Sequence, residues 1–229
     1  MPKTVLITGT MKRYLGSVLF ILSIVTFGAA HAQEVDVALV NLLSGRATFT
    51  ARSGTSGEVK PFMKLRDGDR ITVAAGGQVR IAFFESSRQE LWTGPATFTA
   101  SKAGAGLIAG KAPGITQLPA GVTLRMTRIP ELVKIAKLGG MQVRGLSKHQ
   151  TQAGTDRQTA LAQARSAYET MRQEMPANDI APELYLYAAL YDFRLYRDMK
   201  LVVAEMLRKQ PGNPDVEALD AWLTARMSH

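Results

Sequence analysis

The chain contains no cysteine and only three histidines among its 229 residues. The absence of cysteine excludes a thiol nucleophile, a disulfide framework, an iron–sulfur cluster and a thiolate zinc site. It also excludes lipid attachment at a lipobox, because that modification requires a cysteine. With so few histidines, neither catalysis nor metal binding by imidazole groups is expected.

Hydrophobic residues make up 46% of the chain and charged residues 21%. This balance is typical of a folded protein and excludes both pervasive disorder and a multi-span membrane protein. The length allows one large domain or two small ones. The net charge of +9 suits an anionic surface such as peptidoglycan, lipopolysaccharide or an acidic protein, although solvated lysines would also account for it. The arginines are scattered and form no series with aromatic residues, so nucleic-acid binding is not predicted.

The N-terminal segment has the order of a secretory signal peptide. A Lys-Arg pair at residues 12–13 precedes an apolar run over residues 15–30, which ends in an Ala-x-Ala pattern. We therefore expect cleavage between Ala32 and Gln33, and a periplasmic or secreted protein that is not an integral membrane protein after cleavage. The alternative is a retained N-terminal anchor, although the run is short for a spanning helix, which needs about 20 apolar residues.

The ten residues before Met11 do not fit this order. Residues 2–9 resemble the first strand of a short-chain dehydrogenase, but the glycines of that family's phosphate-binding turn are missing after Thr8-Gly9. No βαβ pattern follows, so we reject this interpretation and expect the true start at Met11. Cleavage would remove three basic and no acidic residues, which leaves a net charge of +6 and two histidines.

The composition changes near residue 155. Sixteen of the 20 glycines lie between Gly45 and Gly154, whereas five of the six tyrosines lie from Tyr168 onward. This change predicts an α+β multidomain protein with a β-rich region followed by a helical one. A polar segment without periodicity joins them. The expected organisation is a signal peptide over 1–32, an all-β domain over 33–128, a short helix and linker over 129–156, and a helical domain over 157–229.

In the β-rich region, short apolar or alternating segments are separated by turns every 8–12 residues, which is typical of a sandwich, a barrel or a β-helix-like roll. Strands are expected over 35–43, 47–51, 59–62, 65–73 (with an internal turn), 78–83, 89–92 and 96–100, and further strands near Leu107, near Ile115 and over 122–126. The segments 89–92 and 96–100 are expected to form a hairpin around residues 93–95.

Four segments of this region, within about residues 36–102, resemble the FecR domain when taken in order. They are Val40 to Ala51, Leu65-x-x-Gly68-Asp69-x-Ile71, Gly77-x-Val79-x-Ile81-x-Phe83 and Leu91-x-x-Gly94-Pro95-Ala96-x-Phe98. Glu85-Ser86-Ser87 replaces the glycine that the family has after the third segment. FecR proteins relay receptor occupancy to a sigma factor through a cytoplasmic segment. About ten residues precede the apolar run, so we do not expect that relay here.

From Arg157 on, the apolar period becomes helical. Helices are expected over 157–175, 182–195, 198–209 and 214–223, with a shorter one over 129–138 and a closing strand over 142–144. Part of this pattern resembles tetratricopeptide repeats (TPR), through Ala164, Tyr168 and Pro176 and then Leu186, Leu190, Tyr196 and Pro211. Tyr187 and Met199 stand where that family has small residues, and a plain four-helix bundle is the alternative.

The candidate partner-binding residues are Tyr185, Tyr187, Tyr191 and Tyr196, because aromatic side chains anchor interfaces. The alternative is that they are core residues with satisfied hydroxyls, in which case Tyr187 and Tyr191 would pack together.

No Ser-His-Asp arrangement, metal motif or Walker loop is present, so no enzyme, cofactor or metal is predicted. Two carboxylate pairs, Asp67 with Asp69 and Glu85 with Glu90, are of the kind that hydrolyses glycosides. The sequence favours a non-enzymatic envelope scaffold or signalling adaptor that binds proteins. A cell-wall or polysaccharide-binding module is the alternative, and an envelope glycosidase is the weakest.

Overall fold

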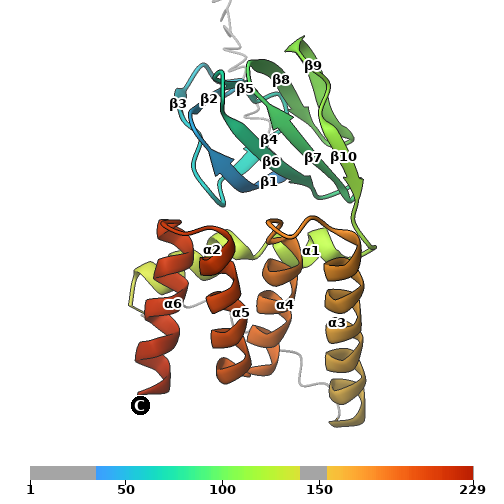
Figure 1. Ribbon diagram of the computed structural model, residues 1–229, viewed down its shortest axis with the longest axis vertical. Coiled ribbons are helices and arrows are strands. Elements are labelled where there is room, and N and C mark those ends of the chain that lie inside the picture. The colour runs from blue at the N-terminus through green and yellow to red at the C-terminus, as the bar shows by residue number, and fades with distance from the viewer. Residues whose placement is uncertain (1–34, 140–153, 229) are drawn as a thin grey trace, which may run out of the picture. The chain divides into compact units, whose positions relative to one another are not determined.

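The computed structural model describes residues 35–139 and 154–228, with side chains of the second stretch described from Asp156. A β-rich region comes first and a helical region second (Figure 1). The described residues form one compact unit. The expected closing strand over 142–144 and the expected signal peptide lie outside the described residues.

Two five-stranded antiparallel sheets make up the β-rich region. The first, sheet A, has the order β10-β7-β6-β1-β4 and consists of β1 (Asp36–Ser44), β4 (Lys64–Arg66), β6 (Gln78–Phe83), β7 (Arg88–Thr93) and β10 (Gly114–Gln117). The second, sheet B, has the order β3-β2-β5-β8-β9 and consists of β2 (Ala47–Thr50), β3 (Ser56–Glu58), β5 (Arg70–Val73), β8 (Ala96–Ser101) and β9 (Gly104–Gly110). Of the architectures left open by the sequence, the structure has the sandwich.

Alternating side chains of both sheets fill the space between them, as the period of two requires. Val79, Ile81 and Phe83 of β6 belong to this core. Trp92 of β7 stacks on Phe98 of β8 with ring centroids 4.1 Å apart. The sandwich therefore closes around one aromatic pair contributed by both sheets.

Three sequence predictions for this region are wrong. The segments 89–92 and 96–100 do not form a hairpin, because β7 belongs to sheet A and β8 to sheet B. The chain crosses between the sheets at Gly94, where a Cβ atom would lie 1.8 Å from the carbonyl oxygen of Ala74. Residues 59–62 are not a strand, since the third strand precedes them, and residues 122–126 are helical.

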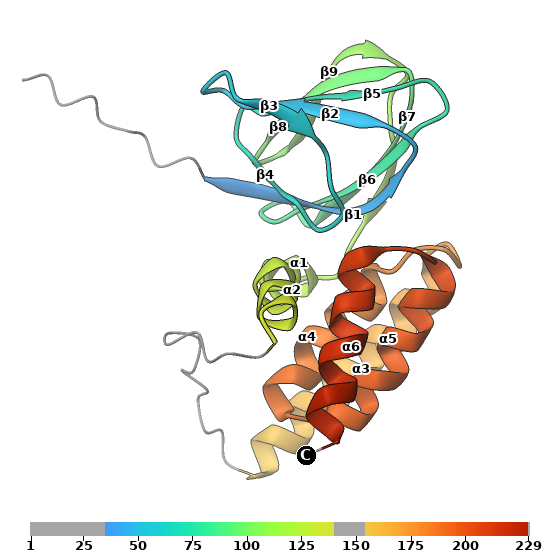
Figure 2. The ribbon, with the colours of Figure 1, turned by 90° about the vertical axis from the view of Figure 1, so that its left-hand side faces the viewer.

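The helical region consists of α1 (Val122–Met126), α2 (Ile129–Lys137), α3 (Gly154–Glu174), α4 (Ala181–Phe193), α5 (Tyr196–Lys209) and α6 (Pro214–Met227). Helices α3 to α6 pack each on the next, while α1 contacts α4 and α2 contacts α6 (Figure 2). Asn213 caps α6, where its side-chain oxygen accepts hydrogen bonds from the backbone N–H groups of Asp215 and Val216. Among the described helices, none combines the length and apolar character needed to cross a bilayer.

The central strands of sheet A are buried on both faces, unlike those of a sheet with one solvated side. In β6, all five residues from Val79 to Phe83 are buried. Val79, Ile81 and Phe83 point into the sandwich and alternate with Arg80 and Ala82. Ala82 belongs to the second hydrophobic core, which the helices form. Leu39 of β1 joins the same core. Sheet A is thus the layer that connects the sandwich core to the helical core.

A buried polar network crosses the contact between sheet A and the helices. Asn41 donates from Nδ2 to Gln89 Oε1 at 2.8 Å, and Gln89 Nε2 donates in turn to Asp179 Oδ2. Arg80 Nη1 lies 3.5 Å from Asp179 Oδ1, and Gln210 Nε2 donates to the backbone oxygen of Asn41 at 2.9 Å. Because polar groups in such a place must be paired, the network fixes how the helices sit on sheet A.

Candidate functional site

The structure divides the four predicted tyrosines into two groups. Tyr185 and Tyr187 are buried, and Tyr187 is only 1% exposed. Tyr191, near the end of α4, and Tyr196, at the start of α5, are half-buried. Burial raises the pKa of Tyr187, and the neighbouring Tyr191 adds to that effect. Tyr187 therefore belongs to the core, and the surface available to a partner includes Tyr191 and Tyr196.

These two tyrosines gather around Trp222 of α6. The ring centroids of Tyr191 and Trp222 are 6.1 Å apart, and those of Tyr196 and Trp222 are 5.9 Å apart in an edge-to-face arrangement. The Arg226 guanidinium lies 5.3 Å from the centroid of the Tyr196 ring. We call Tyr191, Tyr196 and Trp222 the aromatic cluster.

The phenol of Tyr191 in the aromatic cluster stays neutral near pH 7. Burial raises the pKa of Tyr191 above its ordinary value, and Tyr196 raises it further, whereas Arg128 and Arg226 act in the opposite direction. The cluster therefore offers apolar ring surface and phenol hydroxyls to a ligand, and its charge comes from the arginines around it.

Arginines also hold the end of α4 in place. Arg125 and Arg128 both bind Asp192, with Nη1–Oδ distances of 3.1 Å and 2.6 Å. Arg157 of α3 donates from Nη2 to the backbone oxygen of Phe193 at 2.6 Å, and its guanidinium lies over the Phe193 ring. These contacts satisfy groups at the helix C-terminus, where cations are favoured.

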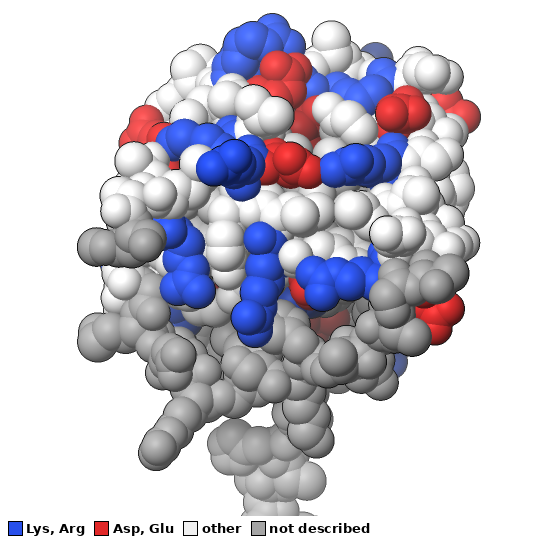
Figure 3. All heavy atoms as spheres, turned by 90° about the horizontal axis from the view of Figure 1, so that it is seen from below, with Lys and Arg blue, Asp and Glu red and all other residues white. Residues whose placement is uncertain are grey.

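The end of the helical region at which α4 and α6 end is rich in basic residues. Arg194 follows α4, Arg197 lies in the first turn of α5, Arg226 lies in the last turn of α6, and all three are exposed. Figure 3 views this end and shows basic side chains, with acidic ones between some of them, around uncharged surface. An acidic partner would be attracted to it.

The carboxylates singled out for hydrolysis have structural partners. Asp69 is buried and accepts a hydrogen bond from the backbone N–H of Arg66 across a turn. Glu90 is fully buried and accepts hydrogen bonds from Trp92 Nε1 at 2.9 Å and from the backbone N–H of Ala105 at 3.2 Å. Arg88 Nε lies 2.8 Å from Glu90. Glu90 thus joins β7 to β9.

Of the other two carboxylates, Asp67 lies in a turn after β4 and is partly exposed, and Glu85 lies in a turn after β6 and is exposed. Within the described residues, no group of three or more His, Asp or Glu side chains could hold a metal ion.

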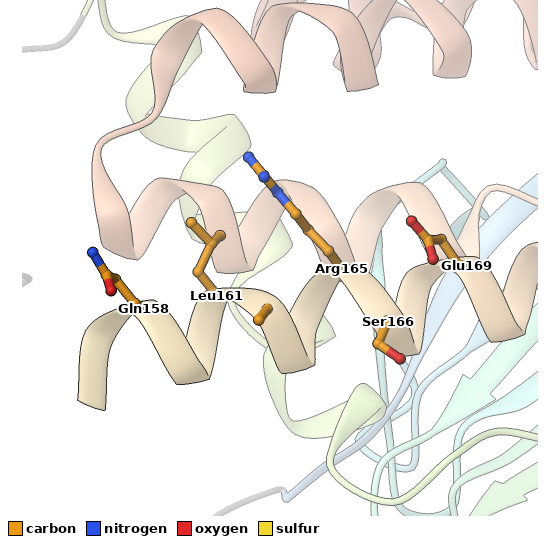
Figure 4. A pocket seen from close by; sticks show the side chains of 6 residues that line it. Gln158, Leu161, Arg165, Ser166 and Glu169 are labelled. Carbon is orange, nitrogen blue, oxygen red and sulfur yellow. The ribbon is translucent and has the colours of Figure 1, made fainter. Parts of the chain in front are cut away.

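Two shallow hollows lie along α3. One, of about 380 Å³, follows a single face of this helix, and Figure 4 shows Gln158, Leu161, Arg165 and Glu169 along it. The other, of about 390 Å³, lies between α3 and α5 and has Leu201 on its border. Arg165 takes part in both and binds Asp198 at 2.6 Å. Their lining contains no arrangement of nucleophile and base.

The sequence analysis did not single out Trp222 and Arg226, which complete the site. Both lie on the helix expected near the C-terminus, and Trp222 is one of only two tryptophans. Its position next to Tyr191 depends on how α4 packs relative to α6, which no local pattern specifies.

The comparisons with known proteins add no identity. No family model and no curated protein matches the chain. A solved structure described as a cell surface anchoring domain is similar over 28% of this chain and 82% of its own length, with 19% sequence identity and a TM-score of 0.26. A similarity at that TM-score supports no conclusion about fold or function.

Proposed function

We propose that the chain is an exported, non-enzymatic scaffold or signalling adaptor of the cell envelope that binds another protein. The observation that supports this proposal is the aromatic cluster, which remains half-exposed beside the exposed side chain of Arg226. Tyrosine, tryptophan and arginine are the residues most enriched where protein interfaces concentrate their binding energy.

The partner that fits this surface is a protein patch with an apolar centre and acidic surroundings. The aromatic rings supply area with little loss of conformational entropy, since each has two side-chain torsions. Arg194, Arg197 and Arg226 supply positive charge at the same end of the helices. Complementary charge would speed association and orient the partner.

Export, a FecR-like identity for the sandwich and a TPR-like identity for the helices belong to the same proposal. The antiparallel sheets and the successive packing of α3 to α6 are compatible with both families. The alternative of a polysaccharide-binding sandwich has less support. In the described sandwich, the large exposed apolar side chains are aliphatic: Val35, Leu107, Ile108 and Ile115. Saccharide binding by stacking would need exposed aromatic rings.

The test is site-specific photo-crosslinking in intact cells. A benzoylphenylalanine replaces Tyr196 in one variant and Thr48, exposed on β2, in a matched control. We expect a protein adduct from position 196 but not from position 48. In the position-196 variant, the additional substitution Arg226→Glu should lower the yield of the adduct, because it reverses the charge beside the cluster. N-terminal sequencing of the fractionated protein should begin at Gln33.

Three outcomes would overturn the proposal. They are adducts to cell-wall glycan alone, equal adducts at both positions, and a protein that stays in the cytoplasm. Once a partner is recovered, Trp222 reports its binding directly. Acrylamide should quench the half-exposed Trp222 but not Trp92, which is fully buried, and a bound partner should protect Trp222.

A further inference from the structure

The strand β9 forms an edge of sheet B. It pairs with β8 on one side, and no described strand pairs with its other side. In an edge strand, alternate residues turn their N–H and C=O groups away from the sheet, where another strand can bind them.

β9 is longer and less charged than the other sheet edges, although its pairing with β8 contains a register shift at Ile108. The edges β3 and β4 are three residues long and carry charge, with Glu58 in β3 and two basic residues in β4. The edge β10 has four residues. By contrast, β9 has seven residues, Gly104–Gly110, with neither charge nor proline. Natural proteins usually block an edge of this length with charge, proline or a short strand.

The side chains of β9 also favour a further strand. Leu107 and Ile108 are 47% and 51% exposed. The pairing with β8 shifts register here, because Leu107 pairs with Phe98 and Ala109 with Thr97, which leaves Ile108 at a bulge. Both apolar side chains are exposed beside the edge. A strand added there would cover both.

Both ends of β9 are held in place. At Gly104 a Cβ atom would lie 2.8 Å from the buried carboxylate of Glu90, and the next residue donates its N–H to that carboxylate. At Gly110 a Cβ atom would lie 2.4 Å from the carbonyl oxygen of Pro95. Because these close approaches fix the backbone, β9 loses little conformational entropy when a second strand binds.

We propose that the outer edge of β9 binds an extended peptide strand of a partner protein, whose central residues are apolar and whose ends are acidic. The exposed Lys102 and Lys111 flank β9 and supply the charges that select acidic ends. They also disfavour a second copy of the chain, because antiparallel pairing of two β9 strands would bring Lys102 of one copy near Lys111 of the other. This surface lies on the sandwich and does not depend on the aromatic cluster.

The probe is a seven-residue peptide that alternates valine and threonine and carries glutamate at both ends. Added to the full mature chain, it should protect alternate β9 amides from hydrogen exchange, namely those that point away from β8. Amides already bonded to β8 should not change. The same peptide with methylated amide nitrogens on its bonding edge should give no protection, since it cannot form the ladder.

The charge requirement is tested with Lys102→Glu/Lys111→Glu. This variant should bind the glutamate-ended peptide about three- to tenfold more weakly and should prefer a lysine-ended one. Leu107→Lys should abolish protection, whereas Leu201→Lys, at a position on α5 that is also exposed, should not. Thermal unfolding of each variant shows that it folds.

The proposal is refuted if the peptide protects no β9 amide, or if the methylated peptide works as well. It is also refuted if light scattering finds a dimer that Leu107→Lys dissociates, since the occupant is then a second copy. None of these results bears on crosslinking at Tyr196, so the two proposals fail separately.

Discussion

Removing the Asp179 carboxylate should destabilise the whole compact unit. Asp179 is fully buried, and its carboxylate accepts hydrogen bonds from Gln89 and from the backbone N–H of Ala181. Arg80, whose side chain is 4% exposed, pairs with it at 3.5 Å. The variant Asp179→Ala leaves that guanidinium buried without its counter-charge. Breaking a buried pair in this way costs about 3–5 kcal/mol.

For a unit of this size, each kcal/mol lowers Tm by about 2–4 °C, so we expect a fall of about 6–20 °C. Urea unfolding of the mature chain, followed by circular dichroism, measures the free energy. The matched control is Asp198→Ala, which removes an exposed ion pair with Arg165 and should cost less than about 1 kcal/mol. A similarly small loss for Asp179→Ala would refute the reasoning.

The double variant Arg80→Met/Asp179→Leu separates the cost of the unpaired Arg80 guanidinium from the cost of the lost hydrogen bonds. Replacement of a buried ion pair by apolar residues of similar volume is often neutral. We therefore expect the double variant to be more stable than Asp179→Ala alone. If it is no more stable, the loss in Asp179→Ala comes from the hydrogen bonds to Gln89 and Ala181, which both variants lack, rather than from the stranded guanidinium.

Three further predictions concern single sites. Gly94→Ala should prevent correct closure of the sandwich, because the added Cβ would meet the carbonyl oxygen of Ala74; the near-ultraviolet dichroism of the buried tryptophan should be lost. The pKa of Glu205 is lowered to about 2, mainly by its hydrogen bond with Arg208. Its small stabilisation should be complete above pH 4.5 and lost as the pH falls towards 2, and Glu205→Gln should lack this dependence in acid unfolding. Burial raises the pKa of Tyr168 to about 12, so ultraviolet titration should show a late phenolate that Tyr168→Phe removes. The stability linked to that tyrosine should be lost as the pH rises from 10 towards 12.

Periodicity predicted most of the secondary structure, because it reports which side of an element faces a core. The strand over 78–83 has the expected bounds, and the helix over 198–209 starts only two residues earlier than expected. Residues 122–126 alternate apolar and polar side chains, which favours a strand locally. In the structure they form α1 and pack on α4, so a contact with residues some 60 positions later decides their conformation.

The crossing at residues 93–95 could not be predicted for a related reason. A glycine-proline pair between two apolar segments is typical of a hairpin turn. Whether the second segment pairs with the first or joins the other sheet depends on β5, which pairs with β8. That partner lies more than 20 residues away in the sequence.

The candidate site was predictable only in part. The four tyrosines look equivalent in sequence, but α4 is surrounded by α1, α3 and α5 and is apolar on nearly every side. A helix that is apolar on all sides has no polar face in its sequence, so the pattern does not indicate which side is exposed to solvent. The difference between the buried Tyr187 and the half-exposed Tyr191 therefore follows from helix packing.

The burial of the central strands of sheet A on both faces has a consequence for how this protein can be divided or recombined. An excised sandwich would present Leu39 and Ala82 to water. The Arg80 guanidinium, the Gln89 side-chain amide and the backbone carbonyl of Asn41 would lose their partners. Such a fragment should aggregate or bind non-specifically, and ligand screens with it would report that artificial face. The smallest piece that can be transplanted into another protein, or truncated without harm, is therefore the sandwich with its helices attached.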